Sequence, residues 1–184
     1  MPSRIHRKRW PQVVAWVVAL LLFMGGWWWE ERFLREPLWQ LGSQQQQGQL
    51  KAGEYNVKRV IDGDTLVLEQ SELRVRLQGI DTPETVQENR PIEPWGPEAS
   101  AYTHEFLETA KWQVRIEVDG ESVDRYGRHL VFIWHKGRLL NEELVSQGLA
   151  HAKTKFNFSE SMKDRLRKAQ STAQKNNRGI WRGQ

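Results

Sequence analysis

An apolar segment near the N-terminus divides the chain into two parts that must fold differently. Residues 13–29, VVAWVVALLLFMGGWWW, contain no charged side chain. Counted from Trp10, the segment is about 20 residues long, which is enough for a helix to cross about 30 Å of hydrocarbon. Trp10 and Trp27–Trp29 lie at its two ends, where membrane helices carry aromatic belts. We therefore expect a transmembrane helix over residues 13–29.

The charges before this segment predict its orientation. Residues 1–12 include four basic side chains, Arg4, Arg7, Lys8 and Arg9. Basic flanks stay in the cytoplasm, so the N-terminus is expected there and the rest of the chain outside it, in the periplasm or the extracellular space. A cleaved signal peptide is the alternative, but cleavage needs small residues at positions −1 and −3. FMGGW has glycine at −1 and Phe or Met at −3, which favours an uncleaved anchor.

The segment after the anchor is predicted to be a linker. Residues 30–53 include GSQQQQGQLKAG, a polar and repetitive stretch typical of a flexible tether, so the folded domain is expected over residues 54–184. The chain has no cysteine, which excludes disulfides and thiolate metal sites. Residues 150–184 contain nine basic and two acidic side chains. This imbalance indicates either an anionic partner or a solvated helix face.

Hydrophobic periodicity predicts short strands followed and interrupted by helices. Strands are expected over residues 55–61, 64–70, 73–80, 113–118 and 129–135, and the last is apolar on both faces and therefore central. Helices are expected over residues 96–111, 141–148 and 159–175, the second capped by Asn141. Asp62-Gly63 is typical of a hairpin turn, so Asp62 is interpreted as a turn residue. This order predicts an α+β domain, a five-stranded OB-fold β-barrel with three helices.

Acidic and basic side chains at the strand ends are candidates for phosphate chemistry. Asp64 opens the second strand and Asp81 ends the third, so paired strands would bring both carboxylates to one end of the sheet. Two carboxylates and a carbonyl suit a hard cation such as Ca²⁺. Glu84, two residues after a proline-fixed Thr82, can accept a proton from water. Each of these residues alone also fits a surface turn.

Arginines complete this candidate set. Arg76 lies on the third strand, and DRYGR at residues 124–128 adds two more arginines in a glycine-containing turn. Arginine binds phosphate bidentately and stabilises charge in a phosphoryl transition state. Together the acids and arginines indicate metal-assisted hydrolysis of a phosphodiester.

Several motifs occur in an order that resembles the staphylococcal nuclease (thermonuclease) family. They are VIDGDTLVL, RLQGIDTPET, WGPEASAYT, DRYGR and LLNEELVSQGLA, which together cover roughly residues 55–181. The resemblance implies an OB-type barrel and a Ca²⁺-dependent endo- or exonuclease that acts on DNA and RNA and leaves 3′-phosphate ends. The expected partner is therefore a DNA or RNA substrate, and the expected oligomeric state is a monomer.

The resemblance also implies roles for individual residues. The implied calcium ligands are Asp64, Asp81 and the backbone carbonyl of Thr82. The implied catalytic residues are Arg76, Glu84 as general base, and Arg128. The implied substrate-binding residues, at the nucleotide's terminal phosphate, are Arg125 and Tyr126.

One departure from the family concerns the base-binding segment. KTKFNF follows GLAHA where the family has a tyrosine-rich run. Phe156 or Phe158 can replace those tyrosines by stacking, or can belong to the core. Two other functions stay open at this point. One is a noncatalytic nucleic-acid-binding OB module tethered to the membrane, and the other is a tether for a protein partner.

Overall fold

The computed structural model describes residues 50–85 and 93–183. Its strands are β1 (Gly53–Asp62), β2 (Thr65–Leu68), β3 (Arg74–Leu77), β4 (Ile80–Asp81), β5 (Gln113–Glu117), β6 (His129–His135), β7 (Arg138–Leu139) and β8 (His151–Ala152). Its helices are α3 (Gly96–Thr109), α4 (Leu140–Ser146), α5 (Glu160–Lys175) and the short 3₁₀ helix η1 (Gly179–Trp181). The predicted order of strands and helices is confirmed in these ranges.

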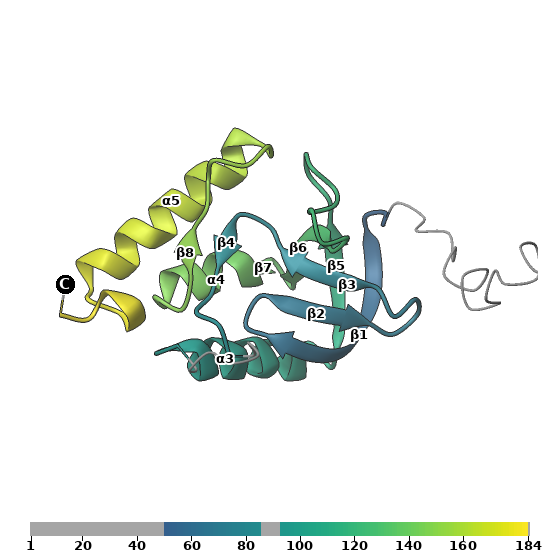
Figure 1. The fold of residues 1–184 in the computed structure, drawn as a ribbon, viewed down its shortest axis with the longest axis horizontal. Coiled ribbons are helices and arrows are strands. Elements are labelled where there is room, and N and C mark those ends of the chain that lie inside the picture. The colour runs from purple at the N-terminus through teal and green to yellow at the C-terminus, as the bar shows by residue number, and fades with distance from the viewer. Residues whose placement is uncertain (1–49, 86–92, 184) are drawn as a thin grey trace, which may run out of the picture. The chain divides into compact units, whose positions relative to one another are not determined.

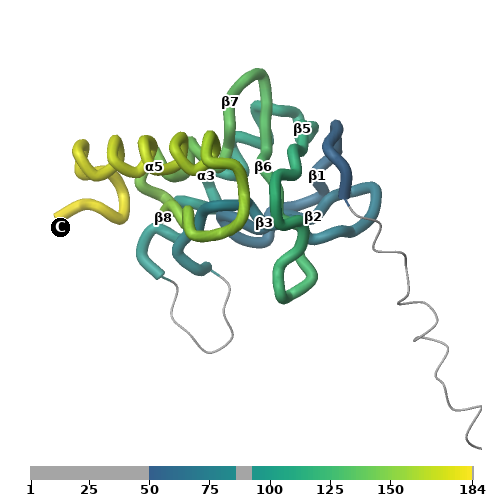
Figure 2. The backbone as a smooth tube through the Cα atoms, turned by 90° about the horizontal axis from the view of Figure 1, so that it is seen from above, coloured from purple at the N-terminus to yellow at the C-terminus, as the bar shows by residue number. Residues whose placement is uncertain are grey.

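Five of the strands close into a barrel (Figures 1 and 2). The sheet order is β3-β2-β1-β5-β6-β7, and β3 also pairs with β6 in parallel, with Val75 opposite His129. This last pairing joins the two ends of the β3-β2-β1-β5-β6 series, so no edge remains in the barrel. The closed five-stranded barrel with three helices fits the predicted OB-fold.

The apolar faces of these strands fill the barrel. Strand β6 pairs with β3, β5 and β7, and its first five residues are buried, as expected for a central strand. Helix α3 packs on β1, and α4 lies between β6 and α5. The largest fully buried apolar side chains are Phe132, Leu66, Leu68, Leu77, Leu107, Ile116, Ile133, Leu139, Leu140, Leu144 and Leu166.

The third predicted strand is interrupted at Gly79. Strand β3 ends at Leu77, and Gly79 has a φ of 75°, where residues with a side chain are strained. A Cβ there would also lie 2.6 Å from Cδ1 of Leu166 on α5. The chain turns at this glycine and continues as β4, which pairs with β8 instead of with the barrel. The run predicted over residues 73–80 is therefore divided at Gly79, where the sequence allows a bulge or bend, into β3 and β4.

Asn141 does not cap α4, contrary to the prediction. It lies inside the helix and is fully buried. Its Oδ1 accepts a hydrogen bond from the amide of Ile133 at 3.1 Å, and its Nδ2 donates to the carbonyls of Gln78 and Val131 at 3.0 and 3.1 Å. The side chain therefore joins α4 to the barrel at the junction between β3 and β6.

No helix within residues 50–85 and 93–183 is long and apolar enough to cross a membrane. The predicted helix over residues 13–29 lies outside the described residues, as do the basic segment 1–12 and nearly all of the linker 30–53.

Candidate active site

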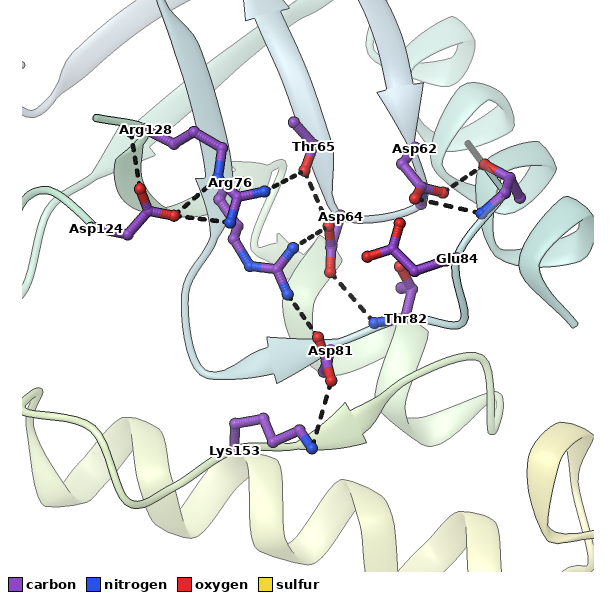
Figure 3. Close-up of polar contacts among 12 residues, drawn as sticks. Asp62, Asp64, Thr65, Arg76, Asp81, Thr82, Glu84, Asp124, Arg128 and Lys153 are labelled. Carbon is purple, nitrogen blue, oxygen red and sulfur yellow. Dashed lines mark hydrogen bonds and ion pairs between the residues drawn. The ribbon is translucent and has the colours of Figure 1, made fainter. Parts of the chain in front are cut away.

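Arg76 brings together the two aspartates that the sequence predicts as metal ligands (Figure 3). Its Nη1 donates to Oδ1 of Asp64 at 2.6 Å, and its Nη2 donates to Oδ1 of Asp81 at 2.6 Å. The pairing of Thr65 with Arg76 across β2 and β3 places Asp64 beside the guanidinium. The turn at Gly79 then returns Asp81 to the other side of it. The expected approach of Asp64 and Asp81 at one end of the sheet is thus present.

The two aspartates differ in their surroundings. The Asp64 side chain is 3% exposed, whereas that of Asp81 is 42% exposed. Burial raises the pKa of Asp64 above its ordinary value, against the opposing effects of Arg76, the amide of Thr82 and the hydroxyl of Thr65. Oδ2 of Asp64 accepts that amide hydrogen bond at 3.2 Å. The buried carboxylate therefore retains part of its desolvation cost, which a bound cation would relieve.

The turn that carries Glu84 is held by the start of α3. The amide of Glu93 donates to the Glu84 carbonyl at 3.0 Å, and the Glu84 amide donates to Oε2 of Glu93 at 3.2 Å. Gly96 lies directly against the turn, because a Cβ on it would be 2.9 Å from the Glu84 carbonyl oxygen and 3.0 Å from that of Pro83. The backbone of the turn is therefore fixed from two sides.

Glu84 lies between Asp62 and Asp64 in Figure 3. Its pKa is raised to about 7, first by burial, then by a hydrogen bond and charge repulsion from Asp62 and by the charge of Asp64, while Arg76 acts in the opposite direction. A glutamate with a raised pKa is a stronger base than an ordinary one, which suits a group that takes a proton from water.

Asp62 belongs to this cluster, although its sequence context predicted only a turn residue. It is 6% exposed, and its Oδ1 accepts hydrogen bonds from the Gly63 amide at 2.7 Å, the Thr85 hydroxyl at 2.6 Å and the Ser100 hydroxyl at 3.3 Å. The first bond is the expected turn interaction. The other two join β1 to the Glu84 turn and to α3, and neither partner is near Asp62 in the sequence.

The turn over residues 124–128 places Arg128 at the opposite side of Asp64 from Asp81. Nε and Nη2 of Arg128 contact Oδ2 of Asp124 at 2.7 Å each, and Nη1 donates to the Thr65 hydroxyl at 3.5 Å. Burial opposes the ionisation of Asp124, but hydrogen bonds from Arg128 and from the amide of Tyr126 lower its pKa overall. Arg76 and Arg128 therefore approach the Asp64–Thr65 corner from two directions.

The side chains of the predicted substrate-binding residues, Arg125 and Tyr126, lie on the same turn and contact each other rather than Asp64 or Asp81. Arg125 donates to the Tyr126 hydroxyl at 2.7 Å and lies over its ring. The Arg128 guanidinium also lies over this ring, 5.3 Å from its centre. Tyr126 is 68% exposed, so much of this side chain is accessible from solvent.

The two phenylalanines left open by the sequence differ in burial. Phe158 is buried and packs edge-to-face on Phe132 in the core. Phe156 is 55% exposed. Of the two, only Phe156 has a ring that can stack on a base.

The candidate metal ligands are all oxygens, which suits a hard cation. Within the described ranges, no group of three or more His, Cys, Asp or Glu side chains is arranged to hold a metal ion. Two carboxylates, Asp64 and Asp81, with the carbonyl of Thr82, would therefore need water as further ligands, as Ca²⁺ accepts. Burial raises the pKa values of Asp64 and Glu84, and neighbouring carboxylates raise them further, so a cation bound here would stabilise the ionised forms. The donor set fits Ca²⁺ on these grounds.

Comparison with known proteins gives a consistent family. The model of a family described as "Staphylococcal nuclease homologue" matches residues 74–183. The "Thermonuclease" of Staphylococcus hyicus is 42% identical over 129 residues, which cover 69% of this chain and 75% of the relative, and that of Staphylococcus intermedius gives the same figures. "Endonuclease YncB" of Bacillus subtilis (strain 168) is 29% identical over 142 residues, which cover 76% of this chain and 67% of the relative. On this similarity and this barrel, the chain belongs to the staphylococcal nuclease family and is a nuclease.

Proposed function

We propose that this chain is a calcium-dependent phosphodiesterase that hydrolyses DNA or RNA by metal-assisted attack of water and leaves 3′-phosphate ends. The observation that carries the proposal is the bridging of Asp64 and Asp81 by Arg76, with Glu84 beside them. This arrangement combines oxygen ligands, a base and a phosphate-binding cation within one corner of the barrel.

The proposed calcium ligands are Asp64, Asp81 and the carbonyl of Thr82. A bound Ca²⁺ supplies Lewis-acid stabilisation of charge on the phosphoryl oxygens. Arg76 is only 16% exposed and contacts two carboxylates, and it is proposed to donate its remaining N–H groups to the same phosphate.

Glu84 is the proposed general base. Its carboxylate accepts a proton from the attacking water as the water oxygen bonds to phosphorus, and the bond from phosphorus to the 5′-oxygen breaks. Arg128 approaches from the side of Thr65 and is proposed to stabilise charge on that leaving oxygen. Arg125 and Tyr126, on the same turn, are proposed to contact the terminal phosphate of the nucleotide.

The nuclease assay tests this proposal directly. The full chain is incubated in detergent with single-stranded DNA, first with Ca²⁺ and then with excess chelator. We expect cleavage with Ca²⁺, loss of cleavage with chelator, and 3′-phosphate ends. Cleavage that is the same in both conditions would contradict the calcium requirement. Absence of cleavage with every divalent ion tested would contradict the proposed nuclease activity.

A substitution separates the base from the binding site. Glu84→Gln should lower turnover by roughly 10²–10⁴-fold, the usual contribution of a general base, while DNA affinity changes little. Glu69→Gln is the matched control, because Glu69 is exposed and its backbone amide bonds to Asn56 on β1, not to a residue of the candidate site. Loss of DNA binding in Glu84→Gln would indicate a structural role for Glu84 instead.

We also propose that residues 13–29 anchor the nuclease domain outside the cytoplasm. The uncharged run and the basic residues before it support this orientation. A reporter enzyme that is active only outside the cytoplasm, fused after residue 184, should be active. A cytoplasmic reporter that is active at the same point would overturn the orientation.

A further inference from the structure

Both carboxylate oxygens of Asp81 are in contact with a cation from the protein itself. Oδ1 accepts from Arg76 at 2.6 Å, and Oδ2 lies 3.3 Å from Nζ of Lys153 (Figure 3). Nothing in the sequence motifs indicated Lys153, which lies 72 positions after Asp81. A divalent cation that uses Asp81 must therefore compete with one of these two side chains.

Lys153 reaches Asp81 through the small second sheet. Strand β8 pairs with β4 so that His151 lies opposite Asp81, and the amide of Lys153 donates to the Gly79 carbonyl at 2.7 Å. These backbone interactions hold residue 153 next to the candidate site, and they do not depend on the conformation of its side chain.

The two cations on Asp81 are not equally easy to displace. The Arg76 side chain is 16% exposed and bonds to a second carboxylate, that of Asp64, whereas the Lys153 side chain is 45% exposed. A half-exposed ion pair of lysine contributes little stability, and the lysine stem is flexible. Lys153 is therefore the easier of the two cations to displace from Asp81.

We propose that Lys153 is a tethered competitor of the divalent cation at Asp81, and that its displaced ammonium then binds a phosphate of the nucleic acid. This inference rests on the proposed calcium-dependent function. In the metal-free chain Lys153 compensates the charge of Asp81 and lowers its affinity for the cation. When the cation takes Oδ2, the ammonium loses its carboxylate but stays beside the site, where an anionic substrate is expected.

The exchange couples the two ligands. The cation frees Lys153 for phosphate, and phosphate draws Lys153 away from Asp81, so each ligand strengthens the binding of the other by the same factor. Without this lysine, the chain should bind the cation more tightly in the absence of nucleic acid. It should also lose part of the coupling between cation binding and phosphate binding.

Calcium titration of the full chain in detergent, without nucleic acid, tests the competition. Lys153→Gln and Lys153→Met remove the charge, and Met keeps most of the apolar stem. Lys155→Gln is the matched control, because Lys155 is an exposed lysine two residues later. We expect both Lys153 variants to bind Ca²⁺ roughly fivefold or more tightly than the unchanged chain, since an exposed ion pair is lost and repulsion of a divalent cation is removed. Lys155→Gln should stay within about twofold, because its charge is farther from Asp81 and screened by solvent.

The outcomes separate this inference from the function on which it rests. If the unchanged chain binds no Ca²⁺, the proposed calcium dependence fails. If it binds Ca²⁺ but the Lys153 variants match the Lys155 control or bind more weakly, the competition fails and the proposed function stands. Circular dichroism of each variant checks the fold. If Lys153→Gln and Lys153→Met give the same change in Ca²⁺ affinity, the change comes from loss of the lysine and not from the particular replacement side chain.

Discussion

Replacing Glu84 with glutamine should stabilise the metal-free chain while abolishing its proposed role as base. The pKa of Glu84 rises from 4.5 to about 7, through burial first and then through Asp62 and Asp64. That difference corresponds to at most about 3–4 kcal/mol of unfavourable interaction in the ionised form, at about 1.4 kcal/mol per pKa unit. Because solvent still reaches much of this side chain, we expect screening to reduce the effect to about 1–2 kcal/mol.

The sign of the effect depends on pH. A carboxyl whose pKa is raised by folding contributes stability that is fully present below its unfolded pKa, near 4.5, and is lost as pH rises through about 7. Glutamine resembles the protonated form and stays neutral. The gain from Glu84→Gln should therefore be small at about pH 5 and complete at about pH 8.

Thermal unfolding by circular dichroism in excess chelator measures this difference. At about pH 8 the Tm of Glu84→Gln should exceed that of the unchanged chain by roughly 3–8 °C, the shift that 1–2 kcal/mol produces in a domain of this size. Glu69→Gln makes the same charge change on an exposed residue and should have little effect at either pH. A gain that is equal at both pH values, or a loss at about pH 8, would refute the explanation by carboxylate crowding.

Two further substitutions test how the site and the barrel are held. Gly96→Ala should lower kcat by about tenfold or more in the nuclease assay, because the new Cβ would lie 3.0 Å from the Pro83 carbonyl oxygen and move the turn that carries Glu84. Gly53→Ala, whose Cβ meets only ordinary contacts, should retain activity. Asn141→Ala should lower the free energy of unfolding by about 2–4 kcal/mol in urea, since it removes the acceptor of the buried Ile133 amide and one donor from each of two buried carbonyls. Unchanged kcat in the first variant, or unchanged stability in the second, would contradict these assignments.

The strands of the barrel were predictable because each one has a hydrophobic pattern within its own short segment of sequence. Alternating apolar residues identify strands such as Gln113–Glu117, and an apolar run on both faces identifies the central strand His129–His135. The small elements β4, β7 and β8 escaped prediction because two residues carry no periodicity. Strands β4 and β8 depend on a pairing between distant segments, Ile80 with Ala152, whereas β7 pairs with the adjacent end of β6.

The sequence predicted side-chain roles less accurately where the hydrogen-bond partners lie far away along the chain. Asn141 before a helix is a reasonable cap on local grounds, but its partners lie on β6 and after β3. Asp62 before glycine is likewise a reasonable turn residue, and it does accept the Gly63 amide. Its bond with the Thr85 hydroxyl depends on the closure of the barrel and has no local signature.

The geometry of the Glu84 turn shows why Pro83 alone cannot account for the proposed site. Proline restricts the backbone on either side of itself, but it does not determine how far Glu84 lies from Asp64. That separation depends on the contact with Gly96 and on the hydrogen bond from Thr85 to Asp62. After burial, the same Asp62 raises the pKa of Glu84 further, so the group that holds the turn also makes the proposed base stronger and the metal-free fold less stable. Positioning and part of the destabilisation thus share one residue, Asp62, and Glu84→Gln should raise stability and lower turnover together.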